Sequence, residues 1–184
     1  MNGGIIKNEF EMNVLTDFKK VTTFIFDIDG VLTDGDLLIL PDGLHARKMN
    51  VKDGFGLQMA IKHDYKVIII SGGISDESKK RLEYLGLKDV HIGITDKVKF
   101  VENLLGSKKI GWDEILYMGD DLPDIGLLEK VGMPACPADA VNEVKGIVKY
   151  ISPYNGGCGC VRDVIEKVLK INGEWKYESN VSSR

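Results

Sequence analysis

The stretch Val21-Thr-Thr-Phe-Ile-Phe-Asp-Ile-Asp-Gly-Val-Leu-Thr-Asp34 joins a short apolar run to a group of acids. The run from Val21 to Phe26 predicts a strand buried on both faces, as the central strands of parallel sheets are. It ends at Asp27, Asp29 and Gly30, and open α/β sheets bind ligands beyond the carboxyl ends of their strands. A single carboxylate there would be typical of a capped strand end followed by a turn. The full run instead indicates a site of chemistry.

The composition is that of one soluble domain. The 184 residues are 43% hydrophobic and 28% charged, and no apolar run approaches membrane-spanning length. The net charge of −4 gives no basic surface for nucleic acid. The N-terminus lacks the long apolar segment of a signal peptide and the three cysteines are too few for a disulfide framework, so we expect a cytoplasmic protein. We divide the chain into an extension (1–20), one α/β domain (21–172) and a tail (173–184).

Strands and helices alternate along the chain. Apolar runs predict strands ending at Ser71, Gly93, Gly119, Ala135 and Ile151, and helices starting at Asp53, Ser75, Asp96, Pro123 and Val161. Such alternation favours a parallel sheet with helices on both faces. One segment differs, because Asp42-Gly43 lies between two apolar or extended runs within Leu37–Met49. This pattern predicts a β-hairpin that projects from the sheet.

Polar residues follow four of the predicted strands. They are Asp27 and Asp29; Ser71 and Gly72; Asp96 and Lys97; and Gly119, Asp120, Asp121 and Asp124. Taken singly, Lys97 is more typical of a surface lysine, Ser71-Gly72 of a loop, and the later acids of a solvated helix N-terminus. Taken together, their order and spacing resemble the four motifs of the haloacid dehalogenase superfamily of phosphotransferases. The resemblance covers nearly the whole chain and implies a Rossmann-like fold.

Phosphoryl transfer needs an in-line nucleophile and a proton donor, and two residues of the opening stretch suit these roles. We interpret Asp27 as the nucleophile, which would form an aspartyl-phosphate and divide one difficult displacement into two easier ones. Asp29 is the candidate general acid, which would protonate the leaving alkoxide and then activate water.

An anionic nucleophile that faces an anionic phosphate needs cations and hydrogen-bond donors around it. Carboxylate and carbonyl oxygens suit Mg²⁺, so we expect Asp27, the backbone carbonyl of Asp29, and Asp120 to hold this ion. Asp121 and Asp124 are expected to orient these ligands. The groups expected to bind the phosphoryl oxygens are the Gly30 and Gly72 backbone amides, the Ser71 hydroxyl and the Lys97 ammonium.

Members of this superfamily usually carry a cap domain after the first or second motif, and here residues 34–71 and 97–120 leave no room for one. Within the capless group, the segments Asp27–Asp36, Leu37–Met49, Asn50–Gly54 and Gly156–Arg162 together resemble the 3-deoxy-D-manno-octulosonate 8-phosphate phosphatases. They also resemble the related phosphatases of nine-carbon keto-deoxy sugar acids. The resemblance implies substrate-binding roles for Asn50, Lys52, Asp53, Gly54, Arg81 and Arg162.

Two positions depart from this pattern. Lys52 stands where the octulosonate enzymes commonly have arginine, which keeps the charge but loses bidentate geometry. Gly73 stands where those enzymes typically have arginine and the nine-carbon relatives glutamate. The sequence therefore leaves open which sugar acid phosphate is preferred.

We expect a capless, Mg²⁺-dependent phosphatase acting on a phosphorylated 3-deoxy-2-keto sugar acid. One alternative is a general small-sugar or nucleotide phosphatase of the same superfamily. Another is a non-catalytic, tetramerising module, like the phosphatase-like domain fused to acylneuraminate cytidylyltransferases. The presence of Asp27, Asp29, Lys97 and Asp120 argues against this second alternative.

The predicted hairpin also indicates that several copies of the protein assemble. Leu37 to Leu40 would expose too much apolar surface in an unpaired hairpin, and the family resemblance implies a homotetramer whose hairpins meet around a shared barrel. We further expect the Gly156–Val161 loop of a neighbouring subunit to cover the site. Arg162 would pair with a substrate carboxylate, because an arginine at a helix N-terminus opposes the helix dipole and favours another partner.

Overall fold

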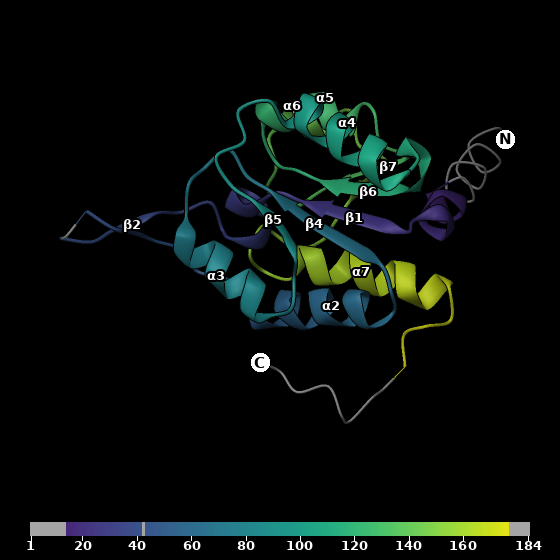
Figure 1. Ribbon diagram of the computed structural model, residues 1–184, viewed down its shortest axis with the longest axis horizontal. Helices are drawn as coiled ribbons and strands as arrows, with labels where there is room; N and C mark the ends of the chain where they lie inside the picture. Colours follow the sequence, from purple (N-terminus) through teal and green to yellow (C-terminus); the bar gives the residue numbers. More distant parts are fainter. Residues whose placement is uncertain (1–13, 42, 177–184) are drawn as a thin grey trace, which may run out of the picture.

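Six parallel strands form the central sheet of the computed structural model, which describes residues 14–41 and 43–176 (Figure 1). Their order across the sheet is β5-β4-β1-β6-β7-β8. The strands are β1 (Thr23–Phe26), β4 (Lys66–Ile70), β5 (Asp89–His91), β6 (Ile115–Met118), β7 (Met133–Cys136) and β8 (Tyr150–Ile151). The opening stretch supplies β1, which pairs with β4 on one side and with β6 on the other. The predicted parallel sheet is confirmed.

Helices cover both faces of this sheet, as predicted (Figure 1). One layer contains α2 (Val51–Lys62), α3 (Asp76–Tyr84) and α7 (Cys160–Ile171), and the other contains α4 (Lys97–Lys108), α5 (Ile125–Leu128) and α6 (Asn142–Lys145). Side chains alternate along β1, so Phe24 and Phe26 enter the core beneath α2 and α7, whereas Ile25 enters the core beneath α4. Burial on both faces explains the unbroken apolar run in the sequence.

Three of the helices are capped at their N-termini by short polar side chains. Ser75 Oγ accepts a hydrogen bond from the Ser78 amide at 3.3 Å, and Asp96 Oδ1 accepts one from the Lys99 amide at 2.9 Å, so both predicted caps are confirmed. The expected cap of α2 was wrong. Asn50 caps this helix by accepting from the Lys52 amide at 2.9 Å, and Asp53 lies inside the first turn.

The hairpin projects from the domain, as predicted (Figure 1). Its strands β2 (Leu38–Ile39) and β3 (His45–Ala46) pair antiparallel and form a sheet of their own. Asp42 of the predicted turn lies outside the described residues. Leu38 is 64% exposed and Ile39 is 71% exposed, so the hairpin presents an apolar surface. Apart from this hairpin, the described chain adds no separate domain over the sheet, and none of its helices is long and apolar enough to cross a membrane.

Candidate active site

The carboxyl ends of β1, β4 and β6 open onto a cleft of about 320 Å³. All four predicted motifs contribute to its lining, which consists of Asp27, Asp29, Gly30, Gly35, Ser71, Gly72, Gly73, Lys97, Asp120, Asp121, Pro123 and Asp124. The structure therefore brings the predicted catalytic, metal-binding and phosphate-binding residues to one place. This is the edge at which open α/β sheets bind their ligands.

A sharp turn after β1 places the first two acids. The Asp27 amide still donates to the Met118 carbonyl at 3.1 Å, so Asp27 continues the pairing of β1 with β6. Gly30 then adopts φ +78°, and a Cβ at this position would lie 2.0 Å from Asp120 Oδ2. Glycine is required here because the Asp120 carboxylate from the end of β6 packs directly against the turn.

Lys97 links the first and last motifs. It is the first residue of α4 and is only 7% exposed. Its Nζ lies 3.1 Å from Asp27 Oδ2 and 2.7 Å from Asp124 Oδ1. The surface-lysine interpretation is therefore excluded, because the ammonium is buried between two carboxylates at the end of the sheet.

Asp124 is the most heavily hydrogen-bonded acid of the site. Its Oδ1 accepts from Lys97 and from the hydroxyl of the fully buried Tyr117, and its Oδ2 accepts from the Asp120 amide at 2.9 Å. Asp124 thus fixes the backbone from which Asp120 projects. Asp121 is exposed, and its carboxylate accepts from the Leu122 amide at 2.8 Å. Tyr117 is a site residue that the sequence did not indicate, because nothing in an apolar strand shows which face will meet an acid.

The site concentrates negative charge. Burial raises the pKa of Asp27 above its usual range; the Lys97 ammonium opposes this, and nearby Asp124 adds to it. Burial, with Asp124 and Asp27 close by, raises the pKa of Asp120 to about 7. Burial lowers the pKa of Lys97, but the Asp27 and Asp124 carboxylates outweigh it, so this pKa is raised overall. The single positive charge of Lys97 therefore does not neutralise the carboxylates of Asp27, Asp120 and Asp124.

This donor set fits a divalent cation. One carboxylate oxygen each from Asp27, Asp120 and Asp124 lies within 4.8 Å of the others. Asp27 Oδ1 is buried and has no hydrogen-bond partner in the described part of the chain, so it is available to a cation. All the donors are hard oxygen atoms, which Mg²⁺ prefers over softer ligands.

The loop after β4 lies on the other side of the cleft. Ser71 is 2% exposed, and its hydroxyl accepts a hydrogen bond from the Gly73 amide at 3.1 Å. This bond leaves the hydroxyl hydrogen available to another acceptor. Gly72 is exposed at the mouth of the cleft.

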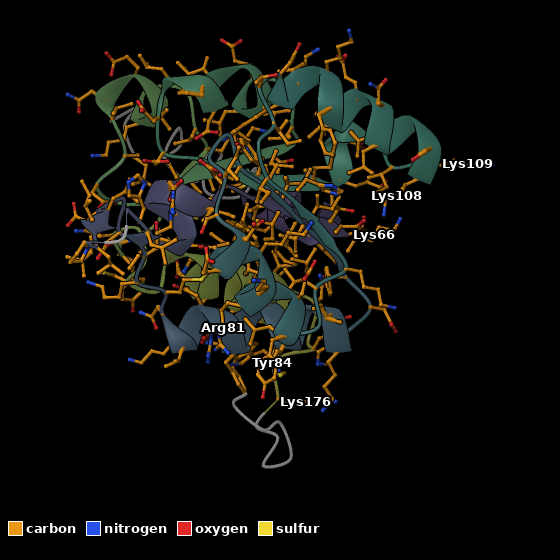
Figure 2. The ribbon with its side chains drawn as sticks, turned by 60° about the vertical axis from the view of Figure 1, so that its left-hand side comes forward. Lys66, Arg81, Tyr84, Lys108, Lys109 and Lys176 are labelled. Carbon is orange, nitrogen blue, oxygen red and sulfur yellow. The ribbon has the colours of Figure 1, made fainter. Side chains whose placement is uncertain are left out.

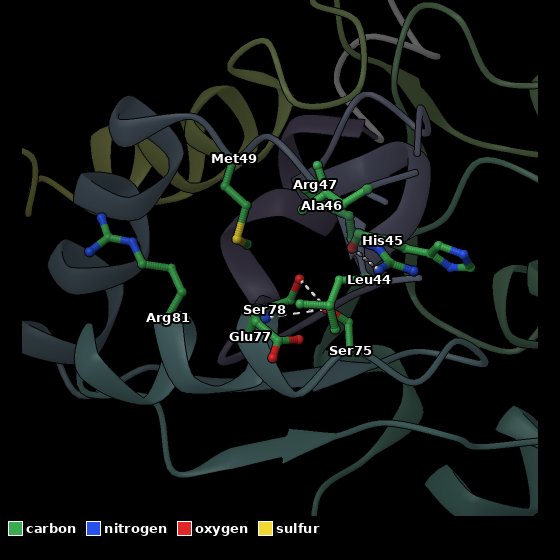
Figure 3. Close-up of a pocket in the computed structure, with 10 residues that line it drawn as sticks. Leu44, His45, Ala46, Arg47, Met49, Ser75, Glu77, Ser78 and Arg81 are labelled. Atoms are coloured by element: carbon green, nitrogen blue, oxygen red, sulfur yellow. Dashed lines mark hydrogen bonds between the residues drawn. The ribbon is translucent and has the colours of Figure 1, made fainter. Parts of the chain in front are cut away.

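Arg47 is a further site residue that the sequence reasoning missed. It follows β3 of the hairpin, and its Nε donates to Asp29 Oδ1 at 2.6 Å. The motif spacing gave no signal for it, because a hairpin's sequence does not show where the hairpin lies relative to the sheet. Arg47 also lines a neighbouring cavity of about 370 Å³ between the hairpin and α3, together with Met49, Ser75 and Ser78 (Figure 3).

None of the six residues expected to bind the sugar lines the catalytic cleft. Asn50 caps α2, and its Nδ2 donates to the Gly157 carbonyl at 3.3 Å. Gly54 packs against Leu85, since a Cβ there would lie 3.2 Å from Leu85 Cδ1. Lys52 is exposed on α2. Arg81 lines the neighbouring cavity, with its guanidinium 5.9 Å from the ring centroid of Tyr84 (Figures 2 and 3).

The structure gives Asp53 a structural role in place of a position in the cleft. Asp53 is 1% exposed, and its carboxylate accepts from the Gly159 amide at 3.1 Å and from the Arg162 amide at 2.7 Å. Both amides belong to the start of α7, where backbone donors have no partner within the helix. Burial raises the pKa of Asp53 to about 6. This carboxylate ties α2 to α7.

The loop expected to act as a lid, Gly156–Val161, is held by contacts within its own subunit. The Gly157 amide donates to the Val31 carbonyl at 2.9 Å, and a Cβ at Gly156 would lie 2.0 Å from the Gly30 carbonyl oxygen. The loop therefore packs tightly beneath the turn of its own active site, and its role as a cover for a neighbouring subunit stays a prediction.

Arg162 has partners within its own subunit. Its Nε pairs with Glu166 Oε2 at 2.9 Å, and its guanidinium lies 4.3 Å from the ring centroid of Trp175 and 5.0 Å from that of Phe55. The helix-dipole argument indicated a partner, and the structure supplies Glu166 on the same helix. The expected pairing of Arg162 with a substrate carboxylate stays a prediction.

Comparisons with known proteins agree with this geometry. A family model described as haloacid dehalogenase-like hydrolase matches residues 84–165. The 3-deoxy-D-manno-octulosonate 8-phosphate phosphatase of Escherichia coli K12 is 32% identical over 162 residues, which cover 88% of this chain and 86% of that protein. This chain belongs to that phosphatase family. It is a haloacid dehalogenase-like phosphatase.

Solved structures of the same phosphatase family have the same fold. The enzyme from Yersinia pestis superposes with a TM-score of 0.86 at 29% identity, covering 88% of each chain. The enzyme from Moraxella catarrhalis, in complex with magnesium, phosphate and KDO, gives a TM-score of 0.84 at 29% identity and covers 88% of this chain and 93% of that one. The parallel sheet flanked by helices is therefore the fold of this family.

Proposed function

We propose that this phosphatase is Mg²⁺-dependent and hydrolyses a phosphorylated 3-deoxy-2-keto sugar acid, either octulosonate 8-phosphate or a nine-carbon analogue. The observation that carries the proposal is the position of Asp27, the residue that directly follows β1. Its carboxylate lies 3.1 Å from the Lys97 ammonium, and Asp29, two residues later, lines the same cleft. The relatives that cover most of this chain are octulosonate 8-phosphate phosphatases, which supports the choice of substrate class.

The chemistry follows from these positions. An oxygen of Asp27 attacks phosphorus, and the bond from phosphorus to the sugar oxygen breaks as Asp29 delivers a proton to that oxygen. Asp29 then removes a proton from water, which attacks phosphorus and restores the Asp27 carboxylate. Lys97, the Ser71 hydroxyl and the Gly30 and Gly72 amides bind the phosphoryl oxygens through both steps.

Mg²⁺ would be held by Asp27, Asp120 and the backbone carbonyl of Asp29, with Asp124 and Asp121 orienting this loop. When bound, it neutralises negative charge between the carboxylates and the phosphate. The excess of acids over Lys97 and the unpartnered Asp27 Oδ1 support this proposal.

Turnover of a substrate panel tests the proposed function. We expect kcat/KM for octulosonate 8-phosphate or its nine-carbon analogue to exceed that for neutral hexose phosphates and nucleoside 5′-monophosphates by at least about tenfold, the effect of one charged hydrogen bond to the carboxylate. Equal turnover of all esters would favour the general sugar or nucleotide phosphatase. No turnover of any ester would favour the non-catalytic module.

Addition of Mg²⁺ is expected to raise the melting temperature. A ligand that binds only the folded protein stabilises it by about 2.7 kcal/mol at a hundred times its dissociation constant. Asp120→Asn should remove most of this rise, whereas Asp36→Asn, at an exposed position outside the cleft, should retain it. Chelation should abolish turnover and added Mg²⁺ should restore it. An unchanged melting temperature together with full activity in chelator would contradict the metal proposal.

We also propose that the protein assembles as a homotetramer in which neighbouring subunits complete each active site. The hairpin surface formed by Leu37, Leu38, Ile39 and Leu44 supports this, because each side chain is more than a third exposed. Lys52 and Arg81 remain proposed contacts for the sugar acid. Static light scattering at micromolar concentration measures the assembly, and a monomer there would contradict it.

A further inference from the structure

The hairpin carries a cation to the edge of the catalytic cleft. The Arg47 side chain is only 9% exposed, whereas that of Asp29 is 36% exposed. Arg47 Nε donates to Asp29 Oδ1 at 2.6 Å and Nη2 donates to Asp29 Oδ2 at 3.4 Å, while Nη1 donates to the His45 carbonyl at 3.4 Å. The guanidinium is therefore anchored by the hairpin backbone on one side and holds the carboxylate on the other.

Gly73 leaves the space in which this pair lies. A Cβ at position 73 would be 2.9 Å from Asp29 Oδ2 and 3.6 Å from Arg47 Nη2. The first distance is shorter than a normal contact, so a side chain at position 73 would displace the carboxylate. The ion pair between Arg47 and Asp29 therefore depends on the absence of a side chain at Gly73.

The two oxygens of Asp29 are held unequally. Oδ1 takes the short bond from Arg47, and Oδ2 takes the longer one and faces the loop of Ser71 and Gly73. A partly exposed carboxylate on a turn can otherwise occupy several rotamers. The bond to Oδ1 fixes one rotamer and leaves Oδ2 directed toward the side of the cleft where Ser71 lies.

We propose that Arg47 is a positioning residue for proton transfer in this phosphatase. It holds Asp29 Oδ1 so that Oδ2 meets the oxygen of the leaving group, and it does not itself bind the substrate. The inference rests on the acid–base role given to Asp29 under the proposed function. An exposed ion pair would contribute little, but a mostly buried arginine that bonds both oxygens is a stronger restraint.

The test compares two esters that differ in the basicity of their leaving group. Phenolate is more basic than 4-nitrophenolate, so its departure depends more strongly on a proton donor. Loss of a well-placed acid should therefore slow the cleavage of phenyl phosphate more than that of 4-nitrophenyl phosphate. With enzyme in excess over ester, release of the phenol in a single turnover measures the first chemical step alone. Arg47→Ala is expected to lower the single-turnover rate for phenyl phosphate by roughly 10- to 100-fold, less than the rate loss expected from removing the general acid itself. It should slow 4-nitrophenyl phosphate only a few-fold.

Three further variants sharpen the experiment. Arg47→Lys should give a partial loss with the same selectivity, since lysine keeps the charge without the bidentate geometry. Gly73→Ala should also slow phenyl phosphate selectively, by displacing Asp29. The matched control is Lys48→Ala, which removes the next cation of the hairpin; that side chain is 75% exposed and pairs with Asp34. Both esters should react normally with it.

Asp29→Asn separates failure of this inference from failure of the proposed function. If Asp29→Asn is selective for phenyl phosphate and Arg47→Ala slows both esters equally, or neither, the positioning role is wrong and the acid role stands. If Asp29→Asn itself shows no selectivity, the acid role of the proposed function is wrong and the positioning role falls with it.

Discussion

Replacing Asp27 with asparagine is expected to lower phosphate release by about 10⁴-fold or more while the protein stays folded. Asparagine has nearly the same shape but its amide is not a nucleophile. Asp27 is 8% exposed at the end of a strand whose backbone pairing does not involve its side chain. Steady-state phosphate release and the melting temperature together measure the effect.

Asp36→Asn is the matched control, because it makes the same change in an exposed residue of the following loop and should leave turnover unchanged. Acid quenching of the wild-type reaction should trap phosphate covalently on the protein, and the Asp27→Asn variant should trap none. A folded variant with near-normal turnover would contradict the nucleophile assignment.

Lys97→Met is expected to lower the free energy of unfolding by about 3–5 kcal/mol as well as to remove activity. Methionine fills a similar volume but leaves Asp27 and Asp124, both almost fully buried, without the ammonium that lies within 3.1 Å of each. Denaturant unfolding without added divalent cation measures the loss. Lys99→Met, an exposed lysine half a turn along α4, should change the unfolding free energy by less than about 0.5 kcal/mol. Comparable small effects of the two substitutions would show that the buried pairing contributes little.

The sequence was informative wherever function depends on the end of a strand. Val21 to Phe26 could be assigned to a central strand because its apolar residues do not alternate with polar ones, and β1 (Thr23–Phe26) is buried on both faces. The acids after it could then be assigned to the carboxyl edge of the sheet. Lys97 was ambiguous in isolation and became a site residue only through its order among the motifs. Its burial between two carboxylates is a tertiary property that no local pattern expresses.

The residues that were missed or misplaced depend on contacts between distant elements. Asp53 looked like a helix cap, but its partners are amides 106 and 109 residues further along the chain. Arg47 reaches Asp29 only because the hairpin folds back toward the turn after β1. The pairing of Arg162 with Glu166 follows helical spacing and was open to prediction, whereas its stacking on Trp175 was not.

The tie between α2 and α7 has a consequence for the order in which the molecule matures. Val164, Ile165, Val168 and Leu169 of α7 are fully buried against the face of the sheet that contains Phe24 and Phe26. During synthesis the strand that precedes Asp27 emerges early, but α7, one of the helices that cover it, leaves the ribosome only after the rest of the sheet has been made. Until then, α2 and α3 can cover this apolar face only in part, and the area that α7 will bury is open to non-native contacts.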